Sequence, residues 1–386
     1  MPAPESTSDA RVVIGMTLYN NARHLVEAGT SLLNQSRSDF VLLMLDDGST
    51  DATEPLAREL ERGDSRVRYF RHQHRQGMVA TWREVVELAE REYPDTQYFA
   101  WASDHDRWHP TWLAHLVGEL DSHPDVVLVY PRSLRIDEGG ETLEKPPRRF
   151  HTLGLSSLDS RWSHFCRHGT GAGDMVYGLI RMAALRNAGI FRPVLRPDRL
   201  LTAELTLQGQ ISQVHDVLWF RRDSGAGSVS RQRTTLFAES SPGWLWLPPW
   251  IQHGFVLLRE YGRASAPRRI PAATLIRMVA LYQVTYMWRH IRRSETWHRV
   301  LRGVDRLHSV KKNVKHAYRQ LVFWTLVNGR HAWGLTRRRL RRLGPEIIAT
   351  MRTVRARIRR ASRRGIYDVL VLTHRLGLRG GSKQEP

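Results

Sequence analysis

The sequence predicts an α/β fold, a mainly parallel sheet with helices on both faces, followed by a basic α-helical C-terminal region. Two observations predict it. Between residues 11 and 135, short apolar runs alternate with segments whose apolar residues recur at helical spacing. From about residue 250, long segments instead mix apolar residues at three–four spacing with Lys and Arg.

Apolar runs that stop at polar residues are typical of buried parallel strands. Five such runs predict strands at 11–18, 39–49, 66–72, 96–104 and 125–136. Helical spacing predicts helices at 22–36, 52–63, 77–92 and 110–124, the last with Pro110 in its first turn. Further along, we expect a helix over 198–209 that ends at Gly209 and a strand over 213–222.

Charge is distributed unevenly along the chain. The formal net charge is +21, yet residues 251–386 hold 31 of the 59 Lys and Arg and only 6 of the 38 Asp and Glu. A near-neutral globular part is therefore joined to a strongly basic one, which points to an anionic partner. The single cysteine, Cys166, excludes an internal disulfide framework and a Cys-rich zinc site, and fits a reducing compartment.

These patterns predict three regions. We expect a disordered N-terminus over 1–10, a globular α/β domain over 11–240 and a basic, mainly helical region over 241–386. The sequence predicts neither a signal peptide nor a transmembrane helix.

Polar residues lie at or just beyond the ends of three of the predicted strands. They are Thr17, Tyr19 and Asn20, then Asp46 and Asp47, then Asp104, His105 and Asp106. In open parallel sheets, ligands bind beyond the carboxyl ends of the strands. The sequence therefore predicts a binding site at this edge.

Four segments carry a family resemblance: "RVVIGMTLYNNARHLVEAGTSLLNQS", "FVLLMLDDGSTD", "FAWASDHDRWHP" and "VYGLIRMAALRNAGIFRP". In order and spacing the chain resembles the family 2 glycosyltransferases of the GT-A fold, from residue 11 to about 235. The resemblance implies inverting transfer of a sugar from a nucleotide-diphosphate donor, usually with a divalent metal. It also implies that residues 11–240 form the catalytic domain, with a nucleotide-sugar half, 11–136, and an acceptor half, 137–240. Within "DDGSTD", it implies that Asp47 contacts the base or ribose, whereas Asp46 is equally suited to capping the turn before Gly48.

The diphosphate needs positive charge around it. Arg75, before Gly77, and Arg222, beside Arg221, are the candidates that the resemblance implies. The metal, Mn²⁺ or Mg²⁺, is assigned to Asp104, His105 and Asp106, read either as an Asp-x-Asp pair or as a site in which His105 replaces a carboxylate. An imidazole ligand would favour Mn²⁺.

Inversion needs a base that removes the proton of the acceptor hydroxyl. The resemblance assigns this role to Asp198 in "RPDRLLTAELTLQG", although Pro197 stands where many relatives have an acidic residue. Glu204 is the second candidate, and helix capping is the structural alternative for Asp198.

The partners follow from the same resemblance. We expect a UDP-sugar donor, a glycan or lipid-linked acceptor, and contact of residues 251–386 with an anionic membrane surface, in a cytoplasmic protein peripheral to the inner face of the membrane. A helical domain packed on the catalytic one is the other explanation of the basic region, and we expect no nucleic-acid partner. A non-catalytic membrane-surface or scaffold protein of the same fold is the alternative function.

Overall fold

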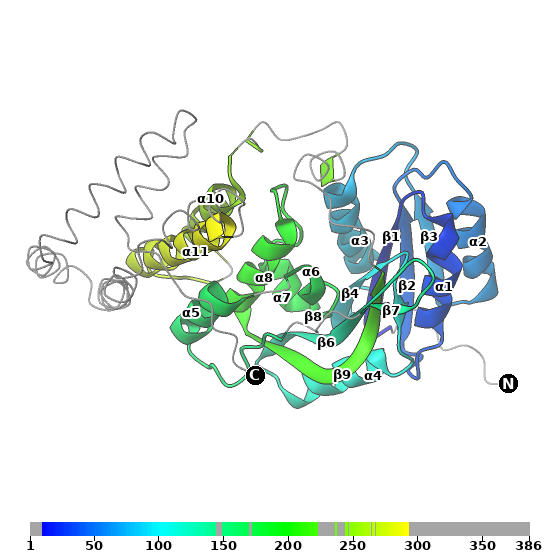
Figure 1. Cartoon of the computed structure of the whole chain (residues 1–386), viewed down its shortest axis with the longest axis horizontal. Helices are drawn as coiled ribbons and strands as arrows, with labels where there is room; N and C mark the ends of the chain where they lie inside the picture. The colour runs from blue at the N-terminus through cyan, green and yellow to red at the C-terminus, as the bar shows by residue number, and fades with distance from the viewer. Residues whose placement is uncertain are drawn as a thin grey trace, which may run out of the picture. The chain divides into compact units, whose positions relative to one another are not determined.

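The structure is a computed structural model that describes residues 10–143, 149–169, 172–222, 236–237, 244–245, 247–263, 265–266 and 268–292. The chain forms two compact units, Met1–Gln283 and Val284–Pro386. The architecture described below is that of the first unit (Figure 1). The helices expected beyond residue 292 lie outside the described residues.

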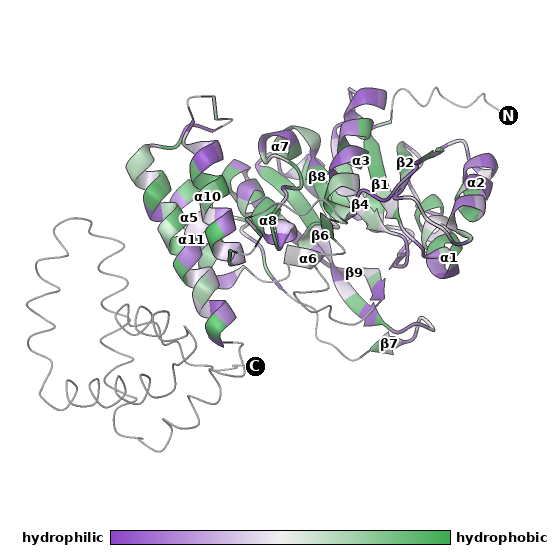
Figure 2. Ribbon diagram, turned by 90° about the horizontal axis from the view of Figure 1, so that it is seen from above, coloured by the Kyte–Doolittle hydropathy of each residue, from purple (hydrophilic) through white to green (hydrophobic). Residues whose placement is uncertain are grey.

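Four parallel strands form the first half of a sheet. They are β1 (Val12–Leu18), β2 (Phe40–Asp46), β3 (Val67–Arg71) and β4 (Tyr98–Ser103), in the spatial order β3-β2-β1-β4. Nearly all residues of β1, β2 and β4 are buried, and Figure 2 shows these three strands as largely hydrophobic. Burial on both faces explains why they are continuous apolar runs, whereas β3, at the edge of the sheet, buries only Val67 and Tyr69.

The second half of the sheet is mixed. The order continues as β8 (Leu179–Arg181), β6 (Val126–Ile136), β9 (Gln210–Arg222) and β5 (Arg107–Trp108), and β7 (Thr142–Leu143) pairs with β6. β6 and β9 run parallel as a long curved ribbon (Figure 1), whereas β8, β5 and β7 pair antiparallel with their neighbours. The sheet is therefore less uniformly parallel than the sequence predicts.

Helices cover both faces of the sheet, as predicted. Helices α1 (Ala22–Leu33), α2 (Thr53–Gly63) and α4 (Trp112–Ser122) contribute to one core, which contains Ile14, Leu25 and Leu113. Helix α3 (Met78–Glu92) packs on the opposite face, where Val85 and Phe99 close around Gly15. A side chain at Gly15 would collide with both.

Further helices follow in the described part of the chain. They are α5 (Leu158–His168), α6 (Ala172–Met175), α7 (Met182–Asn187) and α8 (Pro197–Gln208), followed by α10 (Pro249–Tyr261) and α11 (Ala272–Arg292). Helix α11 packs on α5, where the Trp162 indole donates to the carbonyl of Met278 at 2.8 Å. The first compact unit thus extends to Gln283, further than the expected domain end at 240.

The predicted strands and helices of residues 11–136 are confirmed, as are α8, with Gly209 after its last residue, and β9. Helix α4 begins at Trp112, so Pro110 precedes it rather than lying in its first turn. Strands β5, β7 and β8 were not predicted, because two or three residues carry no periodicity. The helices α6 and α7 were not predicted either, because they are also too short to show periodicity.

Gly178, just before β8, tests the tightness of this packing. A Cβ there would collide with the carbonyl oxygen of Val129 and lie 2.8 Å from Cβ of Tyr130. We expect Gly178→Ala to lower the free energy of unfolding by about 1–3 kcal/mol. Gly118→Ala in α4, where the added Cβ meets nothing within 4 Å, is expected to be neutral or stabilising by up to about 1 kcal/mol. Urea unfolding of both variants measures this, and equal effects would contradict it.

Candidate active site

The carboxyl ends of β1, β2 and β4 lie level with one another. Leu18 is in register with Asp46, and Thr17 with Ser103. The loops that follow these strands therefore start side by side at one edge of the sheet. Parallel pairing alone brings the three groups of predicted site residues together.

Asp104 ties the first and third of these loops to each other. Its Oδ1 accepts from Nδ2 of Asn21 at 2.8 Å and lies 2.8 Å from Nδ1 of His105. Its Oδ2 is 3.4 Å from the backbone N–H of Tyr19. Asp104 is buried, so this carboxylate is oriented by the loop after β1.

Asp46 has a structural role. Its Oδ1 accepts the N–H of Ser49 at 2.8 Å, and its Oδ2 accepts the hydroxyl of Tyr69 at 2.8 Å. The side chain is fully buried. These contacts are those of a turn cap before Gly48, which has φ +77°, the alternative that the sequence left open for Asp46.

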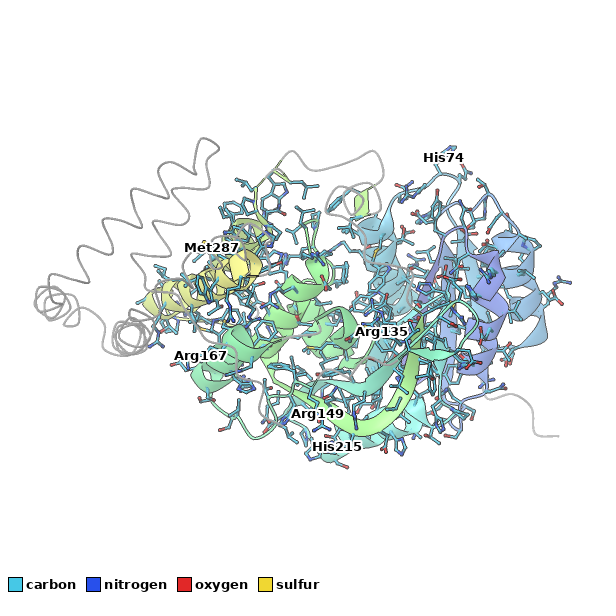
Figure 3. All side chains as sticks on the ribbon, in the orientation of Figure 1. His74, Arg135, Arg149, Arg167, His215 and Met287 are labelled. Atoms are coloured by element: carbon cyan, nitrogen blue, oxygen red, sulfur yellow. The ribbon has the colours of Figure 1, made fainter. Side chains whose placement is uncertain are left out.

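Asp47 holds the loop between β3 and α3. Its Oδ2 accepts the N–H of Gly77 at 2.9 Å, and its Oδ1 accepts the N–H of Gln76 at 2.6 Å. Nδ1 of His72 lies 3.1 Å from the same Oδ1, and Nε2 of His72 lies 2.9 Å from Glu84. His74 lies at the exposed tip of this loop (Figure 3).

The pKa values of this pair follow from those contacts. Burial raises the pKa of Asp47, but hydrogen bonds from His72, Gln76 and Gly77 outweigh burial and lower it. The pKa of His72 is raised, chiefly by its hydrogen bond to Asp47 and also by Glu84, against an opposing effect of burial. An imidazole with a carboxylate at each nitrogen is best satisfied when both nitrogens are protonated.

Arg75 and Tyr19 meet across the same edge. The guanidinium carbon of Arg75 is 4.5 Å from the centre of the exposed Tyr19 ring, and its Nε is 3.9 Å from Asp47. Asn20 adopts a positive φ of 49°, and its Oδ1 accepts the N–H of Thr50 at 2.8 Å. Thr17, half-buried near the end of β1, lies beneath these residues.

The polar groups of Asp106 and Arg222 are occupied by contacts within the protein. Oδ2 of Asp106 accepts the indole N–H of Trp219 at 3.0 Å, and its Oδ1 accepts the N–H of Arg222 at 2.8 Å. The Arg222 guanidinium donates to the carbonyls of His105, Asp137 and Glu138 and pairs with Glu27 at 2.7 Å. Both side chains are buried, so neither is presented to a ligand in this conformation.

Arg221, the candidate beside Arg222, contacts Asp174, Tyr177 and Trp219 instead. It donates to the carbonyl of Gly173 at 3.1 Å and pairs with Asp174, and Arg135 (labelled in Figure 3) pairs with the same carboxylate at 3.1 Å. Its guanidinium lies over the rings of Tyr177 and Trp219. Asp174, Arg135 and Tyr177 were not predicted; nothing in their spacing distinguishes them from surface residues.

Asp198 lies near Arg221, next to Gly173. A Cβ placed on Gly173 would be 3.4 Å from Oδ2 of Asp198 and 3.9 Å from Nη1 of Arg221. Burial raises the pKa of Asp198, and the charges of Arg196, Arg199 and Arg221 offset only part of that rise. The carboxylate is half-buried, at the N-terminus of α8.

Glu204, the second candidate base, is fully buried and pairs with Arg192 at 2.9 Å. Burial raises its pKa to about 8, and its Oε2 has no hydrogen-bond partner among the described residues. A carboxyl group with no exposed surface does not reach an acceptor, which favours Asp198.

Helix α10 fixes the segment that leads to Asp198. Leu195 donates its N–H to Oε1 of Gln252 at 2.9 Å, and its carbonyl lies 2.8 Å from Nε2 of His253. Nδ1 of His253 is 2.7 Å from the hydroxyl of Tyr282, and burial lowers the pKa of His253 to about 3. This neutral, fully buried histidine holds the turn at Arg196, whose φ is +57°. Sequence reasoning missed both α10 residues, because they lie about 55 positions after Asp198.

Comparison with known proteins agrees with this architecture. The family model described as "Glycosyl transferase family 2" matches residues 13–177. Residues 13–177 therefore resemble a glycosyl transferase family 2 domain. The putative glycosyltransferase EpsH of Bacillus subtilis is 22% identical over 223 residues, which are 58% of each chain. An uncharacterized glycosyltransferase of Rickettsia typhi is 28% identical over 151 residues, 38% of this chain and 44% of that one.

The chain thus spans about half the length of these curated relatives. Among solved structures, S. aureus TarS 1-349 in complex with UDP-GlcNAc aligns with a TM-score of 0.52 and 16% identity, over 82% of this chain and 81% of that one. This similarity establishes the GT-A fold predicted for the family 2 domain.

The contacts of His72 predict a pH-dependent stability. Because its folded pKa lies above the ordinary 6.5, its stabilising effect is complete below pH 6.5 and is lost as pH rises through the folded pKa. Wild type should therefore be more stable than His72→Gln at pH 5.5–6, by a margin that shrinks toward alkaline pH. Denaturant unfolding across this range measures the margin, and a margin independent of pH would contradict the assignment.

Proposed function

We propose that this protein is a glycosyltransferase that moves a sugar, with inversion, from a nucleotide-diphosphate-sugar to a hydroxyl acceptor. One arrangement carries the proposal: Asp106 joins the loop of Asp104 and His105 to Trp219, and Arg221, whose guanidinium lies over the Trp219 ring, lies beside Asp198. A carboxylate and an imidazole, a cation and a second, partly exposed carboxylate are thereby held near one another.

The donor would bind along the loops that follow β1, β2 and β3. Tyr19, Asn20 and the loop carrying Arg75 offer an aromatic ring, an amide and a cation to a base, a ribose and phosphates. Asp47 acts on the donor through the 72–77 loop that it orders, since both of its oxygens already accept N–H groups or face His72. A uridine nucleotide is our choice of donor, because TarS, which has a similar fold, is described in complex with UDP-GlcNAc.

The proposed step is a single displacement. The acceptor oxygen forms a bond to C1 of the sugar while the bond from C1 to the diphosphate oxygen breaks, and that oxygen keeps the electron pair. The acceptor proton passes to the Asp198 carboxylate. Arg221 supplies positive charge near the departing diphosphate.

A divalent cation, when bound, would neutralise the charge that develops on the diphosphate. The described residues contain no group of three or more His, Cys, Asp or Glu side chains arranged to hold a metal. Asp104 and His105 nevertheless offer a carboxylate and an imidazole side by side, and one or two protein ligands suffice where phosphate oxygens complete the shell. Asp106, with its oxygens taken by Trp219 and Arg222, would orient this loop rather than bind the ion.

His105→Asp tests the metal ligand. If His105 binds the ion, wild type should prefer Mn²⁺ over Mg²⁺, and the variant should lose most of that preference because it replaces an imidazole by a hard carboxylate. Sugar-nucleotide turnover at matched concentrations of each ion gives the ratio. An unchanged ratio would remove His105 from the site.

Asp198→Asn tests the base. We expect turnover to fall by at least about 10²–10⁴-fold while donor binding, followed by thermal shift, stays within about twofold. Because burial raises the pKa of Asp198 above the ordinary 3.8, wild-type turnover should fall on the acid side at a pH above that of an exposed aspartate. Glu204→Gln is the matched control and should not abolish turnover; the reverse ranking of the two variants would discard the assignment.

The alternative is a protein of the same fold that binds but does not react. Hydrolysis of a panel of sugar nucleotides, with Asp198→Asn as the blank, separates the two functions. Donor stabilisation without any hydrolysis or transfer would favour the non-catalytic function.

We further propose a glycan or lipid-linked acceptor at an anionic membrane surface, contacted by residues 251–386 on the cytoplasmic side. The excess of Lys and Arg in this region supports the proposal. None of the described helices is both long enough and apolar enough to cross a bilayer.

A further inference from the structure

The outward face of α10 is apolar, although it is exposed. Ile251, Phe255 and Leu258, at spacings of four and three residues, share one side of the helix and are 40%, 56% and 42% exposed. The opposite side, with Gln252, His253, Val256 and Leu257, is buried in the unit. A helix that is apolar all round is normally covered on all sides.

Helix α11 extends this surface. Gln283 of α11 donates to the carbonyl of Trp250, and a Cβ on Gly254 would meet the Gln283 amide, so the two helices are in contact there. Ile276 lies two turns before Gln283, therefore on the same side of α11, and is 61% exposed. Together with Ile251, Phe255 and Leu258 it forms what we call the α10–α11 face. These are four of the seven large apolar side chains most exposed in the described part of the chain, so the concentration is local.

Aromatic and basic residues border the α10–α11 face. The Trp244 ring meets Phe255 edge-on, with centroids 5.8 Å apart. Arg259, Arg263 and Arg277 extend from the same helices or the turn between them and keep 49%, 54% and 46% of their side chains exposed, although Arg259 and Arg263 share Glu260 and Arg277 pairs with Asp159. Residues 244–292 contain seven arginines and a single acidic residue, Glu260.

Charge decides what covers this face. A second copy of the chain would bring two arginine borders against each other. Residues 293–386, with 24 Lys and Arg against 5 Asp and Glu, carry a net charge of the same sign. An occupant that is both apolar and negatively charged is required, and an anionic lipid bilayer offers acyl chains beneath acidic headgroups.

We propose that the α10–α11 face docks on anionic membrane, with Ile251, Phe255, Leu258 and Ile276 among the acyl chains and the bordering arginines at the headgroups. The inference rests on the membrane partner of the proposed function and identifies the residues that make the contact. Since His253 and Gln252 of α10 hold the segment before Asp198, the same helix would link membrane contact to the site.

The experiment uses the full chain and a site-specific label. The one cysteine, Cys166, is buried, so Phe255→Cys adds a single accessible thiol for an environment-sensitive fluorophore. We expect its emission to rise and shift to the blue with vesicles of phosphatidylcholine and about 30% phosphatidylglycerol, and to change little with phosphatidylcholine alone. Val26→Cys, on α1 and 45% exposed, is the control and should not respond.

Vesicle co-sedimentation measures how much the apolar side chains of the α10–α11 face contribute to membrane affinity. The double variant Phe255→Ser, Leu258→Ser should bind at least about tenfold more weakly, because two large apolar side chains no longer enter the bilayer. Val26→Ser should bind as wild type does, and added salt should weaken all binding. A silent label at 255, or unchanged binding of the double variant, would overturn the proposal.

Two further outcomes would also overturn it. If the double variant dissociates a dimer of the free protein and leaves vesicle binding unchanged, the face joins two copies. If both labels respond alike, insertion is not confined to this face. Hydrolysis of sugar nucleotides, measured without vesicles, reports separately on the proposed transferase, so failure of either idea is visible by itself.

Discussion

The buried carboxylate of Asp106 joins the two halves of the site. It follows β4, the last of the parallel strands, yet accepts N–H groups from Trp219 and Arg222 at the end of β9. Without these bonds, a buried carboxylate would be left without partners, which is costly. The loop that carries Asp104 and His105 is thereby fixed beside the strand that carries Arg221.

Several acidic side chains of the site serve the protein rather than a ligand. Asp46 caps a turn, Asp47 orders the 72–77 loop, and Asp106 closes the sheet. Each accepts at least one backbone N–H. Among the candidate metal-binding, basic and catalytic residues of this part of the site, His105, Asp198 and Arg221 keep the most exposed surface.

Helix α10 contacts the segment before Asp198 with one side and is exposed on the other. Its buried side supplies Gln252 and His253 to the backbone of Leu195, three residues before Asp198, and its outward side is apolar. This helix lies beyond the residues that match the glycosyl transferase family 2 description. Asp198 also lies beyond residues 13–177, so the candidate base and the helix that holds the segment before it are both outside the matched residues.

The sequence by itself determined the strands and helices of residues 11–136, the edge of the sheet where the polar residues gather, and helix α8 with Asp198 at its start. Periodicity and strand-end position are local properties, so one sequence suffices to read them. Only the tertiary structure decided which of two adjacent residues faces a ligand: Asp46 and Arg222 point into the protein, whereas Arg221 lies beside Asp198. It also brought Leu195 against α10. Such choices depend on hydrogen-bond partners 50 to 120 positions away in the chain, and no local pattern encodes those contacts.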